Sequence, residues 1–93
     1  MSVEVRLPTL LRPAVNGSAS VQIEGETIGD VLRALVSENP GLSGQVLTED
    51  GTLHRFVNVY LNDDDVRYLD RLETKVASGD VISILPAVAG GAN

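Results

Sequence analysis

The chain contains one clear helical pattern, and no second helix is evident to pack against it. Five apolar residues recur at i, i+3, i+4, i+7 and i+8, the spacing of one helix face: Ile28, Val31, Leu32, Leu35 and Val36. Thr27 can cap the first turn, with Asp30 three residues later in a variant of the capping box. Pro40 and Gly41 end the helix near Glu38. Because such a stripe must be buried, the pattern predicts one main helix packed on a β-sheet.

Segments of alternating apolar and polar residues before the helix predict strands. Val3 to Leu7 and Ser18 to Ile23 both alternate with period two, which is typical of half-buried strands. Pro8 and Pro13 lie in the connection, and Asn16-Gly17 is a strong turn signal. The segment therefore predicts an N-terminal hairpin with a long loop.

The segments after the helix predict at least two more strands. Phe56 to Leu61 is the strongest strand pattern, and Asn62 to Asp65 follows it as a turn. A short return strand is expected to begin at Val66. The last strand is expected from Val81 to Leu85, where Pro86 stops it.

This order of elements is that of the β-grasp fold of ubiquitin. In this fold the first and last strands of the chain pair in parallel, and the helix lies in the crossover connection between them. The competing ferredoxin-like fold requires a second helix, and Asp65 to Lys75 is short and irregular. We therefore expect an α+β, ubiquitin-like domain at residues 1–87 and a flexible tail at 88–93. The predicted core consists of Val3, Val5, Val21, Ile23, Ile28, Val31, Leu32, Leu35, Val57, Val59, Ile82 and Ile84.

Composition narrows the function classes. The 93 residues carry a net charge of −6, which disfavours nucleic acid and anionic membranes as partners and favours a protein with a basic surface. Cysteine is absent, so the chain has no thiolate metal site and no Cys nucleophile. No apolar run approaches the roughly 18 residues of a membrane span, and the N-terminus does not resemble a signal peptide. A cytoplasmic location is expected.

The C-terminal stretch "LPAVAGGAN" contains Gly90-Gly91 a few residues beyond the last predicted strand. A glycine carbonyl can approach a nucleophile in a narrow channel, because glycine has no Cβ. The residues before it, Ala87, Val88, Ala89 and Gly90, are small enough to thread into such a channel. A frayed chain end is the alternative explanation of this composition.

Three stretches resemble the ThiS/MoaD family of sulfur carriers, and within it the actinobacterial CysO group: "LPTLLRP" from Leu7, "LHRFVNVYLNDDDVR" from Leu53, and "ILPAVAGG" from Ile84. The resemblance implies a carrier and not an enzyme. A MoeB/ThiF-like adenylyltransferase and sulfurtransferase would adenylate Gly91 with ATP and convert it to a thiocarboxylate. No phosphate-binding loop occurs in this chain, so the partner must bind the ATP.

The resemblance also implies later partners. A PLP-dependent cysteine synthase would accept the sulfur, and a JAMM-type metallopeptidase would release the product. Cysteine is therefore the expected destination of the sulfur, and thiamine, molybdopterin or a secondary metabolite is the alternative. A ubiquitin-like modifier that forms isopeptide bonds through Gly91 needs the same activation step, and a module that only binds would not need its glycines.

Ala92-Asn93 departs from the family pattern, in which the working form ends at the second glycine. The bond between Gly91 and Ala92 is therefore expected to be a processing site. The alternative is that the two residues were appended in cloning.

Strand alternation places Phe56, Asn58 and Tyr60 on the outward side of the sheet, together with Val81 and Leu85. These five residues form a predicted docking surface, since exposed apolar patches commonly mark interfaces. The alternative is that they only cover one another across strands. His54 is expected in a loop without a catalytic role. Asp63 to Asp65 lacks the spacing of a calcium loop, so no metal site is expected.

Overall fold

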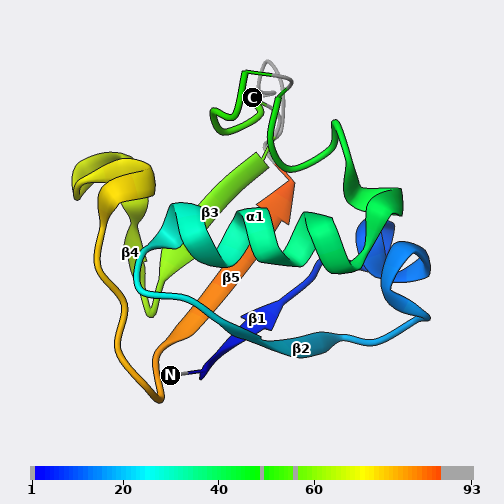
Figure 1. The fold of residues 1–93 in the computed structure, drawn as a ribbon, viewed down its shortest axis with the longest axis horizontal. Coiled ribbons are helices and arrows are strands. Elements are labelled where there is room, and N and C mark those ends of the chain that lie inside the picture. The colour runs from blue at the N-terminus through cyan, green and yellow to red at the C-terminus, as the bar shows by residue number, and fades with distance from the viewer. Residues whose placement is uncertain (1, 49, 56, 87–93) are drawn as a thin grey trace.

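Residues 2–48, 50–55 and 57–86 are described by the computed structural model, and within them one five-stranded mixed sheet carries a helix across one face (Figure 1). The strand order across the sheet is β2-β1-β5-β3-β4. The strands are β1 (Ser2–Arg6), β2 (Ser20–Glu24), β3 (Val57–Leu61), β4 (Asp64–Asp65) and β5 (Val81–Pro86). This arrangement confirms the predicted β-grasp fold.

The first and last strands pair in parallel at the centre of the sheet. β1 and β5 align Val5 with Ile82, while the pairs β1–β2 and β3–β5 are antiparallel. A parallel pair needs a long crossover connection, and the helix lies within that connection. The prediction of an N-terminal hairpin followed by a crossover is therefore confirmed.

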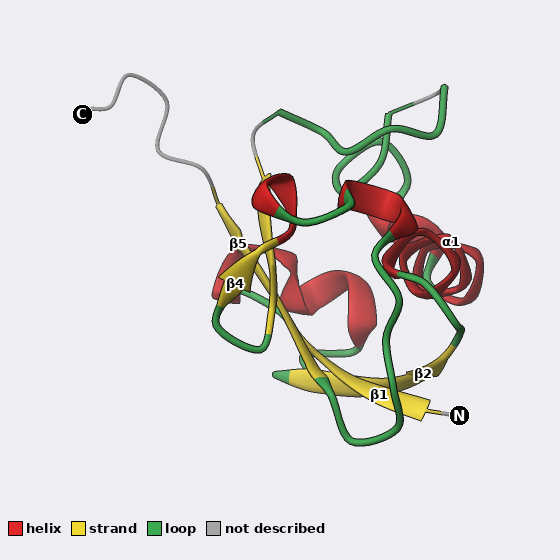
Figure 2. Ribbon diagram, turned by 90° about the vertical axis from the view of Figure 1, so that its left-hand side faces the viewer, coloured by secondary structure: helices red, strands yellow, loops and turns green. Residues whose placement is uncertain are grey.

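The helix α1 (Ile28–Glu38) begins and ends where the sequence predicts. The Thr27 side chain accepts a hydrogen bond from the backbone N–H of Asp30 at 3.1 Å. The Asp30 carboxylate also accepts a 3.0 Å bond from Arg33, which lowers the pKa of this carboxyl. Figure 2 shows α1 nearly end-on beside the sheet. Four residues of its apolar stripe are buried, and the fifth, Val36, is half-buried.

The core contains the predicted residues and several that the strand and helix patterns did not reveal. Eleven of the twelve predicted core residues are buried, and Val21, on the edge strand β2, is half-buried. Leu7 lies at the end of the first predicted strand, and the segments outside the long strands and α1 supply the others. These additional core residues are Leu7, Leu11, Val15, Leu42, Val46, Leu47, Val66 and Val76.

Short 3-10 turns replace several predicted loops: η1 (Thr9–Val15), η2 (Pro40–Leu42), η3 (Val66–Tyr68) and η4 (Arg71–Glu73). The expectation that Val66 begins the return strand is wrong. Asn62 adopts a left-handed backbone with φ of 57°, so the chain reverses at once and β4 forms at Asp64–Asp65. Val66 instead is fully buried and begins η3, which the Asp65 side chain caps by accepting from the Arg67 N–H.

No helix in the described ranges is long and apolar enough to cross a membrane.

Candidate functional site

The C-terminal tail begins at the end of a central strand. β5 lies between β1 and β3, and its last residue, Pro86, is paired with Val57 at the start of β3. The predicted threading residues Ala87, Val88, Ala89 and Gly90 lie outside the described residues, as do the processing residues Gly91 and Ala92. The site that the structure describes is therefore the surface from which the tail departs.

The predicted docking residues lie on the sheet face opposite α1. Val57, Val59, Ile82 and Ile84 are buried towards the helix, so the residues that alternate with them face the other way. Asn58 is paired with Leu85, and Tyr60 with Ser83. Asn58, Tyr60 and Val81 are half-buried, and Leu85 is 45% exposed. Phe56, the fifth predicted residue, lies outside the described residues.

Arg67 is a site residue that the strand pattern did not reveal. Its Nη1 donates a 2.6 Å hydrogen bond to Asn58 Oδ1, and its Nη2 donates a 2.9 Å bond to the Val57 carbonyl. A guanidinium from η3 therefore holds the first residues of β3, next to the tail exit. Arg67 follows the short β3–β4 hairpin, and no repeat in the sequence indicates that its side chain folds back onto the start of β3.

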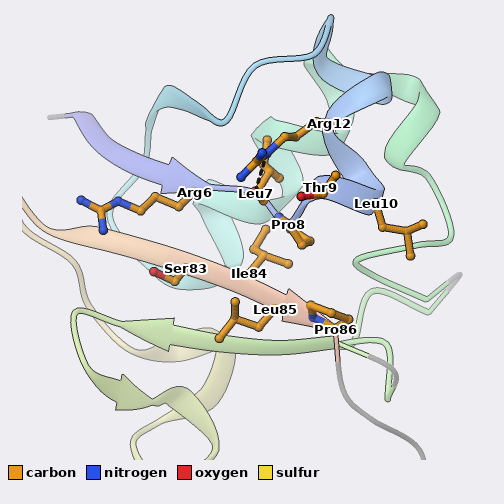
Figure 3. A pocket seen from close by; sticks show the side chains of 10 residues that line it. All are labelled: Arg6, Leu7, Pro8, Thr9, Leu10, Arg12, Ser83, Ile84, Leu85 and Pro86. Carbon is orange, nitrogen blue, oxygen red and sulfur yellow. Dashed lines mark hydrogen bonds between the residues drawn. The ribbon is translucent and has the colours of Figure 1, made fainter.

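A cavity of about 590 Å³ lies on the β1 side of the tail exit, between the β1–η1 connection and the end of β5 (Figure 3). Its apolar wall includes Leu85, Pro86 and Leu10, which is 78% exposed. Two guanidinium groups also line it. Arg12 Nε donates to the Leu7 carbonyl at 3.1 Å, and Arg6 Nε donates to the Glu4 carboxylate at 2.9 Å.

Leu10 and Arg12 extend the predicted docking surface around the end of β5. In the short turn η1, Leu11 is buried and its neighbour Leu10 therefore points to solvent. The adjacent pair Leu10-Leu11 was the available sequence signal, because two consecutive residues of a tight turn rarely share one face. Exposed leucines beside arginine stems can contact an apolar and partly acidic protein surface.

The remaining candidate residues lie in connecting segments, and His54 borders a small cavity of about 210 Å³ at the tail exit together with Leu10 and Pro86. His54 lies in the loop before β3, as predicted, and its backbone N–H donates to the Val46 carbonyl at 2.9 Å. Asp63 lies in the turn between β3 and β4. Among residues 2–48, 50–55 and 57–86, no three His, Asp or Glu side chains are grouped to hold a metal ion.

Comparison with known proteins gives consistent results over the full chain. The sequence model of the ThiS family matches residues 5–91. The chain is 47% identical over 93 residues to the sulfur carrier protein CysO of Mycobacterium tuberculosis, covering 98% of this chain and 100% of that protein. It is 39% identical over 94 residues to small archaeal modifier protein 3 of Haloferax volcanii, with coverage of 98% and 100%.

Solved structures agree with these similarities. A chain in the crystal structure of the BexX/CysO complex of Amycolatopsis orientalis has a TM-score of 0.86 and 44% sequence identity, over 96% of this chain and 99% of that one. The matched region of the family reaches Gly91, five residues beyond the described end of β5.

Proposed function

Because the chain belongs to the ThiS family, we propose that it is a sulfur carrier protein whose working group is the carboxyl end of Gly91. The observation that supports this most directly is the full-length identity of 47% with CysO. The geometry is compatible with it: a central strand presents the tail beside an outward face with exposed apolar side chains. The chain is thus a substrate of other enzymes and not a catalyst.

The proposed chemistry takes place on the tail within a MoeB/ThiF-like partner, which binds the ATP. The Gly91 carboxylate attacks the α-phosphorus of ATP, and pyrophosphate leaves. A sulfide donor then attacks the acyl carbonyl, AMP leaves, and one carboxylate oxygen has been replaced by sulfur. The carrier needs no cofactor of its own, and its role is to bring an unhindered glycine carbonyl to the reacting atoms.

Cysteine biosynthesis is the destination that we propose for the sulfur, because the sulfur carrier CysO is similar over the full length. In that case a PLP-dependent cysteine synthase accepts the sulfur, and a JAMM-type metallopeptidase releases the cysteine. The same peptidase is our candidate for removing Ala92-Asn93. Thiamine, molybdopterin and secondary metabolism are the other destinations for the same thiocarboxylate.

A second candidate function is protein modification. It is supported by the 39% identity with a small archaeal modifier protein. In this case the activated Gly91 carbonyl is attacked by a lysine amine of a target protein, and AMP leaves as an isopeptide bond forms.

Intact mass spectrometry separates these functions. The chain ending at Gly91 is incubated with its adenylating enzyme, ATP and sulfide. A sulfur carrier gains the mass difference between a sulfur and an oxygen atom, whereas a modifier gains the mass of a whole target protein when cell extract is present. A chain that stays unchanged in both mixtures would contradict both functions.

The outward face is expected to govern recognition without affecting folding. Tyr60→Ala is expected to weaken the complex with the adenylating enzyme by about 1–2 kcal/mol, because Tyr60 is a central aromatic side chain of the predicted docking surface. Phe56→Ala is expected to have a similar effect. Calorimetric titration measures the loss, and circular dichroism checks the fold. Tyr68→Ala is the matched control, since Tyr68 is 87% exposed and is not one of the five residues of the predicted docking surface. Equal binding by all three variants and the parent would reject the docking assignment.

The net charge of −6 gives a separate expectation for association kinetics. The association rate with a basic partner is expected to fall as salt concentration rises, while the dissociation rate changes less. Stopped-flow measurements across a salt series test this. A rate that is independent of salt would show that charge does not steer the encounter.

A further inference from the structure

A second cavity concentrates positive charge in an otherwise acidic chain. It has a volume of about 630 Å³ and lies between the loop before β3 and the η3–η4 segment. Three of the seven basic residues of the whole chain line it: Arg55, Arg67 and Arg71. Leu53 and Leu72 supply apolar walls, and Asp70 and Glu73 also border it. We call it the arginine cavity.

Within residues 2–48, 50–55 and 57–86, two of these guanidinium groups form no ion pair with a carboxylate. Arg67 donates its two described side-chain hydrogen bonds to uncharged acceptors, Asn58 Oδ1 and the Val57 carbonyl. In the described part of the chain the ion pairs are Arg6–Glu4 and Arg33–Asp30, so neither Arg67 nor Arg71 belongs to one. Asp70 and Glu73 offset part of the charge of the three arginines that line the cavity, and the excess is positive. This excess charge can attract an outside anion, and Arg67 is already held in place for it.

The backbone of Arg71 is unusual as well. Its φ of 54° places a residue with a Cβ in the left-handed region, which costs of order 1 kcal/mol or more. Glycine or asparagine would adopt this conformation more easily. An arginine in such a conformation, in the wall of a cavity, indicates that its side chain has a role there.

The arginine cavity is adjacent to the start of the tail. Arg67 binds the first two residues of β3, Val57 and Asn58, whose partners across the sheet are Pro86 and Leu85. A protein that covers the end of β5 and the start of β3 would lie close to Arg67, and so to one wall of this cavity. This continuity with the proposed docking surface favours a protein as the occupant.

We propose that the arginine cavity binds a glutamate or aspartate side chain, next to an apolar side chain, on the partner protein that receives the tail. This proposal rests on the proposed function for the identity of that partner. The guanidinium groups pair with the carboxylate, and Leu53 and Leu72 contact the apolar neighbour. The acidic remainder of the chain attracts a partner with a basic surface. The arginine cavity instead binds one acidic side chain of that partner, and this single contact fixes how the two proteins align.

Nuclear magnetic resonance titration with short peptides tests the recognition chemistry directly. The isotopically labelled full chain is titrated with acetyl-Leu-Glu-Leu-Glu-amide, with its glutamine analogue acetyl-Leu-Gln-Leu-Gln-amide, and with inorganic phosphate. The glutamate peptide is expected to shift the amide signals of Leu53, Arg71 and Leu72 with a Kd on the order of 1 mM. At least a tenfold weaker effect is expected from the glutamine peptide and from phosphate.

Two variants and one matched control test whether the glutamate peptide binds at the arginine cavity. Arg71→Asn removes a charge and suits the left-handed backbone, and Arg67→Gln removes the other unpaired guanidinium. Each is expected to weaken glutamate-peptide binding at least fivefold. Arg33→Gln makes the same change in net charge on α1, outside the cavity, and is expected to bind within twofold of the parent.

Three results would overturn the proposal. Equal shifts with phosphate would indicate a small-anion site, equal loss in Arg33→Gln would indicate a net-charge effect, and absence of saturable shifts would indicate no site. Peptide binding needs neither ATP nor Gly91, so a failure to bind the peptide would not contradict the proposed function. A failure of sulfur transfer is detected separately, by the intact-mass experiment.

Discussion

A chain that ends at Gly91 is expected to support pyrophosphate exchange with its adenylating enzyme, and a chain in which Ala92-Asn93 follows is expected to remain at background. In the longer chain the Gly91 carbonyl belongs to an amide, so Gly91 has no carboxylate oxygen to attack the α-phosphorus of ATP. The measurement is exchange of labelled pyrophosphate into ATP on both lengths, with intact mass recorded before and after. Adding the metallopeptidase is expected to activate the longer chain.

A control variant separates the effect of chain length on the exchange rate from the effect of the last residue's side chain. Gly91→Ala in the shorter chain keeps the free carboxylate and adds a Cβ beside it. It is expected to lower the exchange rate by about tenfold to a hundredfold, because a small displacement of the reacting carbonyl is costly. Exchange by the longer chain at the rate of the shorter one, without trimming, would refute the precursor hypothesis. Failure of both lengths would contradict the carrier function.

Leu32→Ala is expected to lower the free energy of unfolding by about 2–5 kcal/mol. Leu32 is fully buried on the α1 face that packs against the sheet, and truncation removes apolar contacts and leaves a cavity. Urea denaturation followed by circular dichroism measures the change, and an unaltered m-value shows that the effect is on stability. For a domain of this size such a loss is a large fraction of the total stability.

Ser37→Ala is the matched control for this prediction. Ser37 lies on the exposed side of the same helix and is expected to change the free energy of unfolding by no more than about 0.5 kcal/mol. A cost below about 0.5 kcal/mol for Leu32→Ala as well would contradict the assignment of the buried helix face.

The helix and the strands could be predicted because the spacing of apolar residues in each one shows which of its residues are buried. The spacing of Ile28, Val31 and Leu32 defines one helix face, and the alternation of Val57 and Val59 defines one strand face. The Thr27 cap and Pro40 mark the helix ends through backbone chemistry that involves only neighbouring residues. These local rules, with the order of the elements, were sufficient for the β-grasp topology.

The fold class, most of the core and the outward face of β3 and β5 could be predicted, since all depend on the apolar period and on the order of elements along the chain. The packing of the irregular segments could not be predicted: Leu11 is buried and Leu10 exposed in η1, and Arg67 lies against β3. This packing also gathers Arg55 and Arg71 at one cavity. Irregular segments have no repeating apolar pattern. Their contacts depend on the long-range packing that leaves the fewest voids and unpaired polar groups, and a short stretch of sequence does not show that packing.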